Sequence, residues 1–291
     1  MLFHDPGAGQ GRGALIVRLH TSEALVLDVR DLHDRDRIVT FLTRERGKKS
    51  GVARGARTRH SRFAGQLQPL AKVQITWFEK EGRDLVRITG VDLVRPVHRL
   101  QADLEGILLG SYLADHMLEF AQEDESSDLL FRLLDSTLEA LLAGADQDVA
   151  ARYFECWMLR LGGIFPSPDA CPQCGAALAR RAVLPVRGET LLCLACGGGG
   201  SGDVEDRGRG RGQGPGQGRA EVPRGRGLLV TAETLEFLRR IGHWTLPQAS
   251  QAAPAAATLR QVEELCARVR RQFLQRELRS YEVIQRTRAA L

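Results

Sequence analysis

The sequence predicts an α+β protein composed of a small β-barrel, a helical bundle and a metal-binding insertion embedded in the bundle. Three observations lead to this prediction. Short β-rich runs crowd into roughly 75 residues of the N-terminal third. The hydrophobic period changes to that of helices after Pro96, and two Cys-x-x-Cys pairs lie between residues 171 and 196. A length of 291 residues allows two domains, or one domain with a large appendage.

The barrel is predicted from runs rich in β-forming residues, each bounded by turn residues. In the clearest of them, Val73, Ile75 and Trp77 alternate with polar residues, which is typical of a half-buried strand and directs Trp77 into the core. About five short strands at this spacing favour the OB-fold, a five-stranded barrel that commonly binds nucleic acid. The other expected strands are 23–30, 36–43, 47–54, 85–88 and 91–94.

Helical periodicity dominates from residue 100 onward. One apolar stripe runs from Leu100 to Phe120, and a second follows over 129–142. A third helix is expected to open at Asp146 or Asp148 and to stop at Gly162-Gly163. We further expect a helix after Thr231, a linker over 247–257 and a last long helix over 258–279, which together make a bundle.

These elements give a domain scheme. Residues 22–96 form the expected OB-fold DNA-binding domain, and residues 97–291 form the helical domain with a zinc-binding insertion at 168–196. Residues 1–21 are expected to be a disordered extension. The tract 197–227 consists mainly of Gly, Arg and Gln, so we expect it to be disordered as well. Its arginines suit either a spacer or an auxiliary nucleic-acid arm, and the lack of aromatic residues favours the spacer.

Four cysteines form the strongest local motif. Two residues between paired cysteines let both thiolates face a single ion, and the glycine after each pair suits a tight turn. Four protein ligands leave no position open for water, so we expect one structural zinc ion per chain. A redox pair and unliganded thiols are the alternatives. The expected ligands are Cys171, Cys174, Cys193 and Cys196. Cys156 and Cys266 are expected to be buried packing residues.

Positive charge is concentrated in one stretch. Between Arg44 and Arg62 eight basic residues oppose Glu45 alone, while the whole chain carries a net charge of +5, so the remainder is slightly acidic. Unopposed like charge destabilises a fold unless an anion uses it, which favours a phosphate-binding surface over a solvated face. The expected DNA contacts are Arg37, Arg44, Lys48, Lys49, Arg54, Arg57, Arg59 and Arg62. Few aromatic residues accompany them, so we expect electrostatic, sequence-independent binding.

The same stretch resembles the RecO family of DNA repair proteins. The resemblance rests on "DRIVTFLTRERG" from Asp36 and "ARGARTRHSRFAGQLQP" from Ala53, and on "ELRSY" near the end. It covers roughly residues 22–196 and 228–285. The extension before Ser22 and the tract 197–227 depart from the family pattern.

The resemblance implies an OB-fold, a helical bundle, an embedded zinc insertion and a closing helix. It also implies a non-enzymatic recombination mediator that binds single- and double-stranded DNA and anneals complementary strands. With RecR, such a protein helps to load RecA onto DNA coated with the single-strand-binding protein SSB. No targeting or membrane-spanning segment is recognised, so we expect a cytoplasmic, nucleoid-associated bacterial protein.

Two other functions are weighed against this one. OB-folds and four-cysteine knuckles also occur in RNA-binding proteins of translation or transcription, but the motif over 53–70 argues against them. A zinc deaminase needs a His-x-Glu motif and a proline before its Cys-x-x-Cys. Here Pro172 follows Cys171, and the sequence has no such His-x-Glu.

Overall fold

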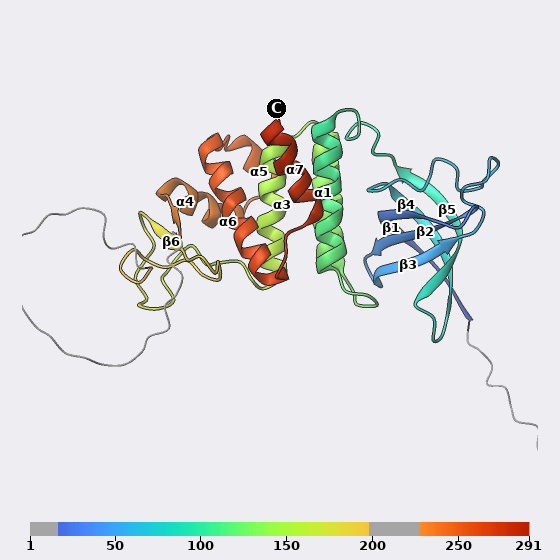
Figure 1. Cartoon of the computed structure of the whole chain (residues 1–291), viewed down its shortest axis with the longest axis horizontal. Coiled ribbons are helices and arrows are strands. Elements are labelled where there is room, and N and C mark those ends of the chain that lie inside the picture. Colours follow the sequence, from blue (N-terminus) through green and yellow to red (C-terminus); the bar gives the residue numbers. More distant parts are fainter. Residues whose placement is uncertain (1–16, 198–226, 291) are drawn as a thin grey trace, which may run out of the picture. The chain divides into compact units, whose positions relative to one another are not determined.

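The computed structural model describes residues 17–197 and 227–290 (Figure 1). Residues 1–16, 198–226 and 291 lie outside it, and with them most of the expected extension and Gly/Arg tract. The chain forms two compact units. The barrel unit contains the described residues up to Val97 together with Ala121–Phe131, and the helical unit contains the rest. Residues 121–131, expected in the helical domain, therefore belong to the barrel unit.

The barrel unit confirms the predicted fold class. Its sheet is a closed barrel in the order β1-β2-β3-β5-β4, in which only the contact between β3 and β5 is parallel. Trp77 and Phe41 are fully buried in the core, with their ring centroids 5.4 Å apart. The strands are β1 (Val17–Leu32), β2 (Asp36–Thr43), β3 (Gly47–Ala53), β4 (Lys72–Lys80) and β5 (Leu85–Arg95).

The barrel begins earlier than the sequence indicated. Residues 17–21, expected within the disordered extension, form the first third of β1 and pair with β4, with Val17 opposite Lys80 and Thr21 opposite Thr76. Polar and apolar residues mix there, so local propensity is weak, and the long-range ladder supplies the backbone hydrogen bonds. The two runs expected at 85–88 and 91–94 form the single strand β5, which is bulged opposite Thr76 and Trp77.

The helical unit follows most of the predicted boundaries. Asp146 caps α3 by accepting a hydrogen bond from the Val149 N–H, and Thr231 caps α4 through the Thr234 N–H. Among the described residues, no helix is long and apolar enough to cross a membrane. The helices are α1 (Leu104–Phe120), α2 (Asp128–Leu142), α3 (Gln147–Leu161), α4 (Ala232–Ile241), α5 (Leu246–Gln251), α6 (Ala256–Leu274) and α7 (Arg279–Ala290).

Two helical predictions were wrong. The linker expected over 247–257 contains α5, because Thr245 and Gln248 form a capping box and Pro247 suits the first turn. The last helix was expected to run unbroken to Arg279. It ends instead at Leu274, where Gln275 adopts a left-handed conformation with φ of 57°, and α7 follows as a separate helix.

Candidate nucleic-acid interface and metal centre

The four cysteines converge as their spacing predicted. Their sulfurs all lie within 4.8 Å of one another, and the Sγ atoms of Cys174 and Cys193 are 3.6 Å apart. A tetrahedral zinc ion with Zn–S bonds of about 2.3 Å requires sulfur separations of roughly 3.8 Å. The residues therefore fit a zinc ion, with Cys171, Cys174, Cys193 and Cys196 as its ligands.

Both cysteine pairs lie in matching turns. The Gly175 N–H donates to the Cys171 carbonyl and the Gly197 N–H to the Cys193 carbonyl, both at 2.8 Å. Gly175 has a φ of 72°, a conformation that most side chains disfavour. Hydrogen bonds from the backbone, of which that from Cys193 has the largest effect, lower the pKa of Cys171 to about 6. Hydrogen bonds with the neighbouring thiols raise the pKa of Cys196 to about 12. Four thiolates this close repel one another, and a divalent cation would relieve the repulsion.

The insertion that carries the four cysteines is attached to the bundle through α4. The short strand β6 (Ala182–Leu184) pairs with β7 (Leu228–Val230), so the segment after the Gly/Arg tract closes the insertion that was expected to end at residue 196. Arg239 of α4 donates to the carbonyls of Pro168 and Leu178, at 3.0 and 2.7 Å. These bonds orient the insertion against the helix, and the cysteine spacing gave no sign of them.

The basic segment divides into two groups at opposite ends of β2. The first group lies at the hairpin between β2 and β3, where the segment 121–131 covers it. Gly47 makes this contact possible, because an added Cβ would lie 2.1 Å from the Glu125 carbonyl oxygen. Arg44 lies 3.7 Å from the Asp128 carboxylate and stacks over Phe131 at 4.9 Å. Acidic residues therefore neutralise much of this end.

Lys49 is the expected DNA contact that the structure contradicts. Its side chain is buried and forms ion pairs with Glu79, at 2.8 Å, and with Asp124. Both carboxylates raise its pKa, although burial alone would lower it. An ammonium group buried with two partners has no surface to offer a phosphate. Its role is to hold the acidic segment against the barrel.

The second group lies on the loop between β3 and β4 and is open to solvent. We call residues 54–62 the basic loop. Arg54, Arg57, Arg59 and Arg62 are all exposed there. Arg37, at the start of β2, is half-buried and lies 3.5 Å from the Asp31 carboxylate. Arg57 lies 3.4 Å from the Asp31 carboxylate, whereas the other three loop arginines form no ion pair within the described part of the chain, so most of this charge is available to a polyanion.

Backbone and core contacts fix the shape of the basic loop. The Gly55 N–H donates to Asp36 at 2.8 Å, and the Arg57 N–H donates to the Arg35 carbonyl at 3.0 Å. Phe63 and Leu67, just after the loop, are buried in the barrel core. The cations therefore stand on an anchored scaffold, which lowers the entropy lost when they bind phosphates.

One basic residue of the barrel surface was missed. Arg35 is exposed in the turn between β1 and β2. Its carbonyl accepts a hydrogen bond from the Arg57 N–H, so Arg35 lies beside the basic loop. Only its place in the "DRDR" run could have indicated this. Four aromatic residues of the barrel are candidates for stacking on bases. Of these, Phe41, Phe63 and Trp77 are buried, whereas Phe78 is exposed on the outer face of β4. Its place next to a core tryptophan in the strand alternation was the available signal.

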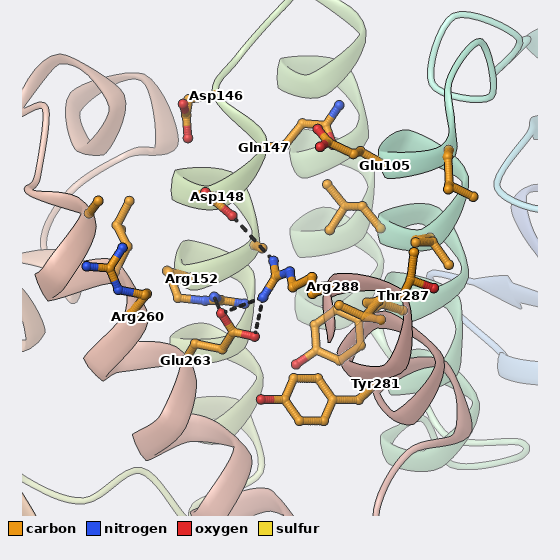
Figure 2. A pocket seen from close by; sticks show the side chains of 18 of the residues that line it. Glu105, Asp146, Gln147, Asp148, Arg152, Arg260, Glu263, Tyr281, Thr287 and Arg288 are labelled. Atoms are coloured by element: carbon orange, nitrogen blue, oxygen red, sulfur yellow. Dashed lines mark hydrogen bonds and ion pairs between the residues drawn. The ribbon is translucent and has the colours of Figure 1, made fainter. Parts of the chain in front are cut away.

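The helical unit contains a cavity of about 680 Å³ between α1, α3, α6 and α7 (Figure 2). Ion pairs cross its wall: Arg152 donates to Glu263 at 2.7 Å, and Arg288 donates to Glu263 at 2.8 Å. Burial alone would raise the pKa of Glu263, but the two arginines outweigh burial and hold it below its usual value. These arginines are already neutralised by carboxylates, which makes the cavity a poorer candidate for a phosphate site than the basic loop.

Acidification is expected to destabilise the helical unit through His116. Burial and the nearby Arg270 hold its pKa well below 6.5, and its Nδ1 lies 2.9 Å from the Tyr112 carbonyl. Below pH 6.5 the unfolded chain binds a proton that the folded chain excludes, so the free energy of unfolding falls as pH falls. The slope contributed by His116 is at most about 1.4 kcal/mol per pH unit.

Thermal unfolding of the wild type and of His116→Gln between about pH 7 and pH 5 measures this contribution. Glu155 acts in the opposite direction, because burial raises its pKa, so the difference between the two proteins is the informative quantity. Identical slopes in wild type and variant would contradict the assignment.

Comparison with known proteins agrees with this architecture. The family model described as Recombination protein O N terminal matches residues 17–97, which begin where β1 begins. The model described as Recombination protein O C terminal matches residues 101–282. The chain belongs to the RecO family. Membership assigns it a role in DNA repair and recombination and confirms the resemblance seen in the sequence.

Individual RecO proteins are similar over about 60% of the chain. DNA repair protein RecO of Anaeromyxobacter sp. (strain K) is 39% identical over 173 residues, which cover 59% of this chain and 68% of that protein. RecO of Geobacter sulfurreducens is 39% identical over 179 residues, or 60% of this chain and 72% of that protein. RecO of Myxococcus xanthus is 34% identical over 178 residues, with coverages of 61% and 72%.

Proposed function

We propose that the protein binds single- and double-stranded DNA through the basic loop and anneals complementary strands. The observation that carries the proposal is the group of exposed arginines anchored on a closed barrel. Phosphates of any sequence satisfy guanidinium groups equally well, so the binding is sequence-independent and falls steeply with salt. Neutralising two polyanions lets them approach, and annealing requires no catalytic residue.

We further propose that the protein acts with RecR to load RecA onto SSB-coated DNA, as family membership suggests. The four-cysteine centre would hold one zinc ion in a structural role, because all four tetrahedral positions are taken by protein sulfurs. DNA binding would place the protein at the bacterial nucleoid.

Strand annealing tests the proposal. Complementary oligonucleotides coated with SSB are mixed with the protein, with and without RecR, and duplex formation is followed by fluorescence. We expect the protein to accelerate annealing and RecR to support RecA filament formation on the same DNA. If duplex forms no faster than with an unrelated basic protein of equal charge, the annealing function is refuted.

A further inference from the structure

The outer face of β1, β4 and β5 carries a row of side chains that the basic loop does not explain. Leu19, Phe78 and Arg87 lie directly opposite one another on the three strands, so they share one face of the sheet. Lys80 follows Phe78 by two residues and therefore shares that face of β4. Leu19 is 58% exposed and Phe78 is 38% exposed, which is unusual for large apolar side chains in neighbouring positions. We call Leu19, Phe78, Lys80 and Arg87 the outer row.

Phe78 of the outer row is the one exposed Phe, Tyr or Trp among the described residues of the barrel unit. Every other Phe or Trp in that part of the chain is buried: Phe41, Phe63, Trp77 and Phe131 are each at most 2% exposed. With 38% of its surface exposed, Phe78 has ring surface open to a partner. Nucleic-acid bases are flat partners that stack on such rings irrespective of sequence.

Cations border this ring. Within the described residues, neither the Lys80 ammonium nor the Arg87 guanidinium has an ion-pair partner. The nearest turn, between β4 and β5, contains Glu81 and Asp84, but neither forms an ion pair with these two cations. An aromatic face flanked by unpaired cations matches a base joined to its phosphates, and it matches an apolar protein surface less well.

We propose that Phe78 is a base-stacking residue that gives the protein a preference for single-stranded over double-stranded DNA. The proposal rests on the proposed DNA binding and adds a site distinct from the basic loop. Bases of a single strand are free to leave their own stack, whereas bases of a duplex are held inside it. A base stacked on Phe78 through its flat face keeps its pairing edge free, so it can still meet a complementary strand.

The test compares Phe78→Ala with the wild-type full chain on three probes: a deoxythymidine oligonucleotide, a duplex of equal length and an abasic oligonucleotide of equal charge. Affinity for the oligonucleotide is expected to fall about tenfold. Affinity for the duplex and the abasic strand is expected to stay within about twofold, and the salt dependence should not change, because no phosphate contact is lost. Phe78→Trp should restore the affinity, and its fluorescence should be quenched by the oligonucleotide.

Leu93→Ala is the matched control, because Leu93 on β5 is 41% exposed and cannot stack. It should bind all three probes like the wild type. The stacking proposal would be overturned if Phe78→Ala lost affinity equally for all three probes, or lost none for the oligonucleotide. It would also be overturned if the variant lost affinity only for a protein such as RecR. If the wild type itself binds no DNA, the proposed function fails instead.

Discussion

Replacing Cys193 by serine is expected to abolish the proposed zinc binding and to unfold the insertion around the four-cysteine site. Apparent zinc-binding free energies in small zinc-finger peptides are about 10–16 kcal/mol, and this energy is folding energy because the site does not exist in the unfolded chain. A serine hydroxyl is a poor zinc ligand, so several kcal/mol of local stability should be lost. Metal content by mass spectrometry and thermal unfolding of the full chain measure both effects.

Cys156 and Cys266 provide the control for this experiment. Their sulfurs are buried against each other at 3.9 Å in the helical unit, away from the four-cysteine cluster. Cys156→Ala should keep one zinc per chain and lose only the packing of a small buried side chain. Full zinc occupancy in Cys193→Ser would refute the four-cysteine site. Loss of zinc in Cys156→Ala would mean that the ligands had been assigned to the wrong cysteines.

Local pattern was sufficient for much of the fold. Alternation over 72–77 placed Trp77 in the core, and its side chain is fully buried. The predicted 36–43 strand is β2. The cysteine spacing brought the four sulfurs together, because a knuckle is formed by neighbouring residues. In each case the sequence signal lies within a few neighbouring residues, and the long-range contacts of the fold agree with it.

Long-range contacts account for what the sequence did not show. The sequence gives no sign that Lys49 is paired, because its partner Asp124 lies 75 residues later in the chain. The acidic residues at 123–125 lie just before a helix, where complementing the helix dipole explains them locally, so their sequence does not indicate a contact with the barrel. Residues 17–21 likewise become a strand only through pairing with β4. Charge in a sequence can be counted, but its neutralisation depends on which segments the fold brings together.

Reversing two arginines of the basic loop is expected to weaken DNA binding on the order of 50-fold at about 0.1 M salt. The variant is Arg57→Glu with Arg62→Glu. Each lost phosphate contact reduces the salt slope of log K by about 0.9 for a duplex, and two contacts therefore give this loss. Single and double strands of unrelated sequence should be affected alike, unlike in Phe78→Ala. Both side chains are exposed, so the melting temperature should change little.

Arg180→Glu with Arg181→Glu separates local contact from overall charge. These arginines are exposed in the zinc insertion, and their reversal changes the net charge of the chain by the same amount. If the basic loop makes the contact, this control should keep nearly wild-type affinity and salt slope, because charges beyond about 10 Å are largely screened at this salt. Equal weakening in both variants would mean that net charge attracts the DNA. Wild-type affinity in the loop variant would mean that the basic loop is a solvated face.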